Sequence, residues 1–350
     1  MNRLVVTVWD GAVVVGPPGP VENLVRNGLP DTPPVTLAVS GGQLVWPWSL
    51  DGAGDLDPDA TLTQPPVAVL DDVTSAQDWL WALYGHDAAL AVDAARTQTS
   101  VVCAPGLRWL PESAARCAFG TWLAAWWPAS TTDGIPALDP PTLRAELEPL
   151  GARLDLLFDE TGPPLPSAAA GRQPTHDRYA LAAGPADSGP SAAVGVSVST
   201  GAGGTVWSDL PAGWVDASDL AVSWRLLHDL DHWSLQVRVA AGPVVVTDQA
   251  RLVAEAPGRR VELRPGSDSF GRCWLGEATG TEPGPAPERV RVYLPGFAPE
   301  NPSGSERWHE SVRALARARL AAAGTPSGSG PAVTSPWQAE RAASSGHDDY

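Results

Sequence analysis

Residues 219–241 read DLAVSWRLLHDLDHWSLQVRVAA and contain the strongest local pattern in the chain. Apolar side chains alternate with polar ones before residue 228 and again after residue 231, as in strands with one buried face. The four residues from His228 to Asp231 separate the two runs, so the pattern predicts a β-hairpin. Because each strand has one apolar face, the hairpin needs further strands and a second layer to bury it.

Short β-type runs separated by turn residues continue around this hairpin from residue 192 to residue 294. Many short strands at close spacing are typical of a β-sandwich or an open barrel. Ser305 then caps a helix whose apolar side includes Trp308 and Val312. We therefore expect a β-sandwich-like or open-barrel domain with a C-terminal helix packed against its sheet.

The first part of the chain combines hairpin signals with helix signals. Asp10-Gly11 and Gly41-Gly42 each stand between apolar runs, which predicts two tight β-hairpins. Three amphipathic helices follow, beginning near Ser75, Pro111 and Pro140. Strands and helices are segregated along the chain instead of alternating, so the predicted fold class is α+β.

Composition shifts predict four regions along the 350-residue chain. They are a mixed α+β domain at 1–160, a linker rich in Pro, Gly and Ala at 161–190, a β-rich domain with its C-terminal helix at 191–324, and a disordered tail at 325–350.

The tail contains one helix signal, Ser335-Pro336-Trp337-Gln338, with a capping residue, a first-turn proline and a capping-box glutamine. A helix of about two turns is too short to be stable alone in water. It could dock on a partner or on the protein's own surface with Trp337 as its anchor. The alternative is an inert solvated tail.

Charge and composition exclude several functional classes. All 23 basic residues are arginine, so chemistry that needs a lysine is excluded: pyridoxal-phosphate enzymes, P-loop nucleotidases and protein kinases. A formal net charge of −17 argues against nucleic acids and anionic membranes as partners. The 16 tryptophans supply anchors of the kind that dominate protein interfaces, although GC-rich codon usage also favours them.

The expected compartment is the cytoplasm. The apolar run near the N-terminus, Leu4 to Trp9, is too short for the core of a signal peptide, and no run reaches the length of a membrane span. Three cysteines, Cys103, Cys117 and Cys273, form no CxxC motif and are odd in number, so we expect free thiols.

One cluster has the residue types of a metal site. His228, Asp229, Asp231 and His232 place two imidazoles and two carboxylates within five residues. The i, i+4 histidine spacing resembles that of a zincin helix, but the flanking alternation predicts a hairpin turn instead. We therefore expect no cofactor. The alternative is one divalent transition metal bound by these side chains across the turn.

Other candidate site residues carry weaker signals. Trp127 falls beside the apolar stripe of the second helix, so it is a candidate for an exposed partner-binding residue. The Asp55, Asp57 and Asp59 loop matches only the first positions of a calcium loop. Acid-base pairs would leave no local trace, and the acids near predicted element ends are Asp71, Asp72, Asp155, Asp159 and Glu160.

These observations favour a non-enzymatic cytoplasmic protein that binds another protein. The common catalytic signatures, GxSxG, HExxH and GxGxxG after a strand, are absent from the sequence. The acidic composition and the tryptophans agree with an interaction or scaffold role. The alternative is a metal-dependent enzyme, or a metal-binding module, that uses His228 and His232.

The predicted linker is directly testable by limited proteolysis. Segments rich in Pro, Gly and Ser are preferred sites of cleavage, so we expect the first cuts between Gly162 and Pro190. Mass spectrometry of the fragments locates the cuts. First cuts that fall elsewhere, together with a single concerted unfolding transition, would contradict the assignment.

Overall fold

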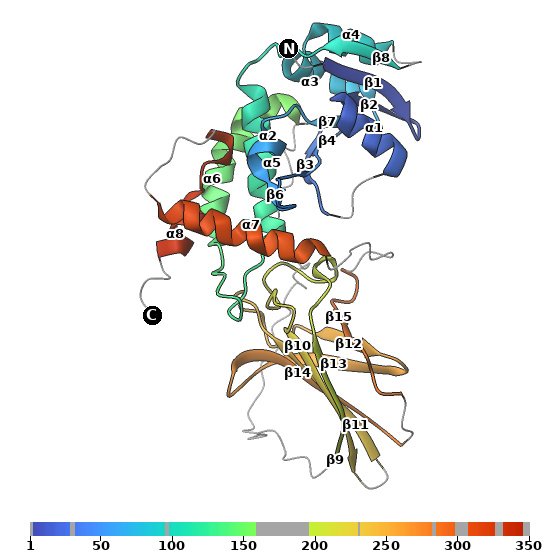
Figure 1. Cartoon of the computed structure of the whole chain (residues 1–350), viewed down its shortest axis with the longest axis vertical. Helices are drawn as coiled ribbons and strands as arrows, with labels where there is room; N and C mark the ends of the chain where they lie inside the picture. Colours follow the sequence, from blue (N-terminus) through green and yellow to red (C-terminus); the bar gives the residue numbers. More distant parts are fainter. Residues whose placement is uncertain are drawn as a thin grey trace, which may run out of the picture. The chain divides into compact units, whose positions relative to one another are not determined.

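The computed structural model of the chain describes residues 3–28, 32–94, 98–158, 196–229, 232–281, 285–297, 307–325 and 332–345. The chain forms two compact units (Figure 1). Unit 1 comprises Met1–Trp127, Ile135–Pro166 and Ser303–Tyr350, and unit 2 comprises Pro128–Gly134 and Ser167–Pro302. Helices and antiparallel sheets both contribute, so the predicted α+β class is confirmed.

Unit 1 is built on a six-stranded antiparallel sheet with the strand order β3-β4-β7-β2-β1-β8. Its strands are β1 (Arg3–Trp9), β2 (Ala12–Gly16), β3 (Val35–Val39), β4 (Gly42–Trp46), β7 (Val67–Leu70) and β8 (Thr99–Val102). A separate pair consists of β5 (Ser49–Leu50) and β6 (Leu56–Asp57).

Both predicted hairpins are present in this sheet. Asp10 and Gly11 join β1 to β2 and have positive φ angles of 50° and 81°, as a primed two-residue turn requires. In the second hairpin the turn lies one residue earlier than predicted, and Gly42 already pairs with Val39. A Cβ on Gly42 would lie 2.2 Å from the Val69 carbonyl oxygen, so this position requires glycine for close strand packing.

The helices of unit 1 come from both ends of the chain, and Figure 1 shows α5 and α6 side by side. They are α1 (Pro18–Asn27), α2 (Pro58–Leu62), α3 (Val73–Tyr84), α4 (His86–Asp93), α5 (Leu110–Trp126), α6 (Pro140–Arg153), α7 (Arg307–Gly324) and α8 (Gln338–Ser345), with the short 3-10 helices η1 (Asp155–Leu157) and η3 (Ala332–Thr334). The sequence predicts α3, α5, α6 and α7 but misses α1, α2 and α4. The three missed helices are short, with 10, 5 and 8 residues respectively.

Large aromatic side chains fill the interior of unit 1, and backbone carbonyls satisfy several of their polar atoms. Trp79 Nε1 donates to the Ser40 carbonyl at 2.9 Å, and the Tyr84 hydroxyl donates to the Pro66 carbonyl at 3.0 Å. The Pro33 carbonyl accepts from two indoles, those of Trp48 and Trp122, at 2.9 and 3.0 Å. These bonds remove most of the cost of burying the polar edge of each ring.

The described residues of unit 2 form a curled antiparallel sheet with the strand order β15-β12-β13-β14-β11-β10-β9 (Figure 1). Its strands are β9 (Val196–Gly203), β10 (Val222–Asp229), β11 (His232–Ala240), β12 (Leu252–Ala256), β13 (Arg259–Asp268), β14 (Gly271–Gly280) and β15 (Arg291–Tyr293). A short 3-10 helix, η2 (Trp207–Asp209), follows β9. The sheet is therefore an open half-barrel, which is the second of the two predicted forms.

The hairpin at residues 219–241 supplies much of the core of this half-barrel. Its β10 and β11 strands pair as predicted, and the alternating apolar side chains, including Trp224 and Val237, are buried. Trp274 of β14 stacks on Trp214 at 5.8 Å, and its indole N–H donates to the Trp214 carbonyl at 3.1 Å. The loop that carries Trp214 therefore covers the buried face of the sheet.

The C-terminal part of the chain differs from the expectation. Helix α7 was expected to pack against the β-rich domain, but it groups with unit 1, where Trp308 packs edge-on against Trp126 of α5 at 5.3 Å. Residues 332–345, expected to be disordered, form η3 and α8 and bury Trp337 to 1% exposure. The segment orders because it packs on α5, α6 and α7, although it lacks the apolar surface to fold alone. The predicted linker at 161–190 lies outside the described residues.

Residues 128–134 are anchored within unit 2 by one buried carboxylate. Asp216 is 1% exposed and accepts from the Ser130 hydroxyl at 2.7 Å, from the Thr131 amide and hydroxyl at 2.8 and 3.0 Å, and from the Ser218 amide at 3.0 Å. Four bonds satisfy both oxygens, as a buried carboxylate requires.

Replacing this carboxylate should destabilise unit 2. Asp216→Ala leaves the buried Ser130 hydroxyl, the buried Ser218 amide and the part-buried Thr131 amide without their acceptor, and we expect a loss of about 3 kcal/mol in the free energy of unfolding. Urea unfolding followed by tryptophan fluorescence measures it. The matched control is Asp248→Ala, since Asp248 is exposed and should change stability by less than about 0.5 kcal/mol. Equal effects of the two substitutions would contradict the anchoring role.

Candidate functional site

The C-terminal segment, residues 332–345, lies in a groove of unit 1 formed by helices α5, α6 and α7. We call this surface the docking groove and define it by the residues that hold the segment: Arg116 and Gly120 of α5, Glu146 of α6 and Arg319 of α7. These contacts bring together parts of the chain separated by about two hundred positions.

Trp337 is the apolar anchor of the segment. Its side chain is 1% exposed, and its ring lies against Gly120, where an added Cβ would come within 2.7 Å of the indole Cζ2 atom. The Arg116 guanidinium lies over the ring, with Cζ 4.0 Å from the ring centroid. Gly120 therefore makes the space that Trp337 occupies, and Arg116 adds a cation-π contact.

The groove also binds the backbone of the segment, at its carbonyl groups and at its amide groups. Arg116 Nη1 donates to the carbonyls of Ala332, Val333 and Ser335, at 3.2, 3.4 and 2.9 Å. The Glu146 carboxylate accepts from the amides of residues 338 and 339, with its shortest bond at 2.8 Å. These amides belong to the first turn of α8, where no intrahelical partner exists, so Glu146 caps the helix from a neighbouring element.

A buried ion pair closes the arrangement. Glu340 is 0% exposed and pairs with Arg319, which is 6% exposed, through two N–H groups of the guanidinium. The same carboxylate accepts from the Trp337 amide at 2.8 Å, and Arg319 Nη1 donates to the Thr334 carbonyl at 3.1 Å. The acid of the predicted capping box is thus Glu340 and not Gln338, because the helix begins two residues later than the sequence signal indicates.

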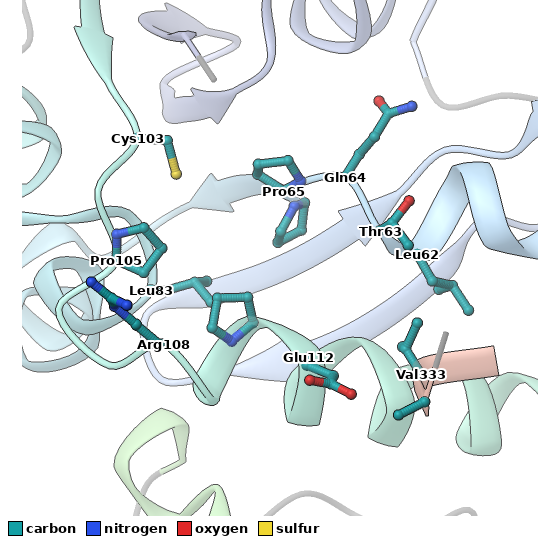
Figure 2. Close-up of a pocket in the computed structure, with 13 residues that line it drawn as sticks. Leu62, Thr63, Gln64, Pro65, Leu83, Cys103, Pro105, Arg108, Glu112 and Val333 are labelled. Carbon is teal, nitrogen blue, oxygen red and sulfur yellow. The ribbon is translucent and has the colours of Figure 1, made fainter. Parts of the chain in front are cut away.

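A pocket of about 560 Å³ lies beside the docked segment in unit 1 (Figure 2). Figure 2 shows Cys103, Pro105 and Arg108 at one end of the pocket and Leu62 and Val333 at the other. The full lining is Leu62, Thr63, Gln64, Pro65, Pro66, Leu83, Cys103, Pro105, Arg108, Pro111, Glu112, Ala332 and Val333. Two of these residues belong to η3, so the docked segment supplies part of the wall.

The pocket combines a rigid apolar wall with a few polar groups. Four prolines fix the backbone around it, and Leu83 and Val333 add apolar surface. Burial raises the pKa of the Cys103 thiol above its ordinary value, so the thiol stays protonated at neutral pH. A protonated thiol is a weak nucleophile, which argues against a catalytic cysteine here.

The hairpin register separates the two histidines of the predicted cluster. The hairpin register pairs His228 with Trp233 and Asp229 with His232, and successive residues of a strand point to opposite faces. The two imidazoles therefore lie on opposite faces of the sheet, and the His228 ring packs 4.3 Å from the Trp233 ring. Asp231 and the side chain of Asp229 lie outside the described residues.

The hypothesis of one metal ion bound by the cluster stays a prediction, because Asp231 and the side chain of Asp229 lie outside the described residues. Within the described ranges, no group of three or more His, Cys, Asp or Glu side chains could hold a metal ion. No described helix is long and apolar enough to cross a membrane.

The other predicted site residues have local structural roles. The Trp127 side chain is only half-exposed, and its indole donates to the Pro136 carbonyl at 2.8 Å. Asp57 caps α2 through the Ala60 amide, and Asp72 caps α3. The Ser75 hydroxyl and amide bonds hold the pKa of the Asp72 carboxyl below its ordinary value. Asp159 and Glu160 lie outside the described residues.

Sequence reasoning identified Trp337 but missed its partners. Arg116, Gly120, Glu146 and Arg319 occupy unremarkable positions on amphipathic helices, and only the tertiary packing brings them to one groove. The available signal was the pairing of a helix start with a tryptophan in an otherwise polar tail.

Comparisons with known proteins give no further assignment. A scan against protein-family models, a search of curated proteins and a search of solved structures each found no match to this chain.

Removing the anchor should open the pocket. Loss of a buried Trp side chain costs about 3 to 5 kcal/mol, so Trp337→Ala should release the segment and uncover the wall that Val333 supplies. Cys103 is already half-exposed, so we expect iodoacetamide to modify it about two- to threefold faster in this variant, because the open state becomes populated. Mass spectrometry of the peptide that contains Cys103 measures the rate.

Two controls accompany this measurement. Gln338→Ala changes an exposed side chain of the same segment and should leave the rate unchanged. Cys117, whose thiol pKa burial raises to about 11, should stay unmodified unless the whole unit unfolds. An unchanged Cys103 rate in Trp337→Ala would show that the segment does not cover the pocket.

Proposed function

We propose that this protein is a non-enzymatic, cytoplasmic interaction protein whose docking groove binds a short helical segment of another protein. The observation that carries the proposal is the occupancy of the groove by the C-terminal segment. Trp337 is 1% exposed in the groove. Around it, groove side chains bind the backbone amides and carbonyls of the segment and the carboxylate of Glu340.

This arrangement has the features of a peptide-recognition site. A short helix lies in a groove with one aromatic anchor, as in the helix-in-groove mode of protein recognition. Hot spots of interfaces are enriched in tryptophan and arginine at buried positions, and Trp337, Arg116 and Arg319 combine these types. A partner with an equivalent tryptophan and acid would compete with the C-terminal segment for the same contacts.

The proposed compartment and the absence of an enzymatic activity come from the sequence. The three cysteines are free thiols, which agrees with a reducing environment. The absence of lysine excludes several catalytic classes, and Cys103 is a protonated thiol at neutral pH. Each of these observations supports an interaction role.

The proposal predicts binding of the segment in trans. A fluorescent peptide of residues 331–345 is titrated with the full chain and with full-length Trp337→Ala, and anisotropy reports binding. In the original chain the C-terminal segment occupies the groove. The added peptide binds only those molecules whose segment has left the groove, so its apparent affinity is reduced in proportion to their fraction. We expect the peptide to bind Trp337→Ala at least about tenfold more tightly, because that variant removes the competitor's anchor.

Matched controls separate specific docking from adhesion. The same peptide with Trp337→Ala should not bind. Full-length Trp337→Ala with the additional change Gly120→Ala should also lose binding, since the new Cβ would lie 2.7 Å from the indole. Circular dichroism verifies that both full-length variants are folded. Equal binding of the two peptides, or no binding to folded Trp337→Ala, would overturn the proposal.

A further inference from the structure

The pocket beside the docked segment contains two opposite charges that have no partner within the described part of the chain. Arg108 and Glu112 line the pocket, and neither side chain makes a hydrogen bond or an ion pair with another described residue. Glu112 lies in the first turn of α5, where the helix dipole stabilises an acid. Arg108 lies just before the same helix and has no comparable stabilisation.

The remainder of the lining is suited to an apolar body. Pro65, Pro66, Pro105 and Pro111 give it a rigid shape, and Leu83 and Val333 complete the apolar surface. A volume of about 560 Å³ lies in the range of small-molecule sites, which are mostly apolar with a few polar groups that orient the ligand. Such a site needs no large rearrangement to accept a ligand.

We infer that this pocket binds an apolar amino acid or a similar small molecule, one that carries a carboxylate, an ammonium group and an apolar side chain. The carboxylate pairs with Arg108, whose planar guanidinium suits bidentate binding of a carboxylate. The ammonium group pairs with Glu112, one helical turn further along the chain. The apolar side chain of the ligand lies against the prolines, Leu83 and Val333.

Charge complementarity separates this ligand class from simpler ones. A ligand with only a carboxylate would place its charge near Glu112 without compensation, and a ligand with only an amine would do the same near Arg108. The protein has a formal net charge of −17, so most of its surface repels anions. An arginine side chain with no acidic partner among the described residues is therefore a favourable place for a small anion to bind. The pocket shares Ala332 and Val333 with the docked segment, but Arg108 and Glu112 are not residues of the docking groove, so the two proposals can fail separately.

The test uses the full chain and three matched probes: L-phenylalanine, L-phenylalaninamide, which lacks the carboxylate, and N-acetyl-L-phenylalanine, which lacks the ammonium group. Protection of Cys103 from iodoacetamide reports occupancy, because its thiol lines the pocket. Buried Cys117 serves as the internal control for unfolding. Equilibrium dialysis with radiolabelled phenylalanine measures binding in parallel. It gives the affinity even where Cys103 reacts too slowly with iodoacetamide to report occupancy.

We expect phenylalanine to bind at least about tenfold more tightly than either modified probe, since each lost charge-assisted bond is worth about 1.5 kcal/mol or more. In Arg108→Gln, phenylalanine and its amide should bind alike. In Glu112→Gln, phenylalanine and its N-acetyl derivative should bind alike. Both substitutions are at exposed positions and should leave the fold intact.

Two results would overturn the inference. One is the absence of binding and of Cys103 protection by phenylalanine up to its solubility limit. The other is a preference among the three probes that persists unchanged in Arg108→Gln and in Glu112→Gln, because it would place the ligand away from these charges.

Discussion

The position of the C-terminal segment depends on one buried carboxylate, that of Glu340. An ionised group at 0% exposure must have partners for both oxygens, and Arg319 and the Trp337 amide supply them. A shift of α8 by one residue would remove these bonds and leave two buried charges unpaired. The pair therefore contributes less to net stability than to the choice of a single register, while the burial of Trp337 supplies the favourable free energy.

The groove distinguishes a few side chains of the segment and tolerates the rest. Arg116 contacts backbone carbonyls and Glu146 contacts backbone amides, so these bonds depend on the path of the chain and not on side-chain identity. Specificity lies in two positions, the tryptophan that fills the space beside Gly120 and the acid that meets Arg319. A groove of this kind selects a conformation and two anchors, which many sequences can provide.

The sequence predicts those parts of the fold that local chemistry determines. Asp10-Gly11 fixes a turn through backbone conformation, and the alternation at residues 219–241 fixes which side chains face the core, so both hairpins form as expected. The placement of α7 and of the C-terminal segment depends instead on surfaces that only exist after folding. For the same reason Arg108 and Glu112, which are ordinary charges in the sequence, become notable only because their side chains have no partner in the described part of the tertiary structure.

The groove and the pocket are linked because η3 belongs to both. Arg116 holds the carbonyls of Ala332 and Val333, and these same residues form part of the pocket wall. A ligand that contacts Val333 makes that contact only while the segment is docked, so it binds the docked state more tightly than the open state. By thermodynamic linkage it must then disfavour displacement of the segment by an equal factor. If both proposals hold, a small molecule in the pocket reduces the access of a protein partner to the groove.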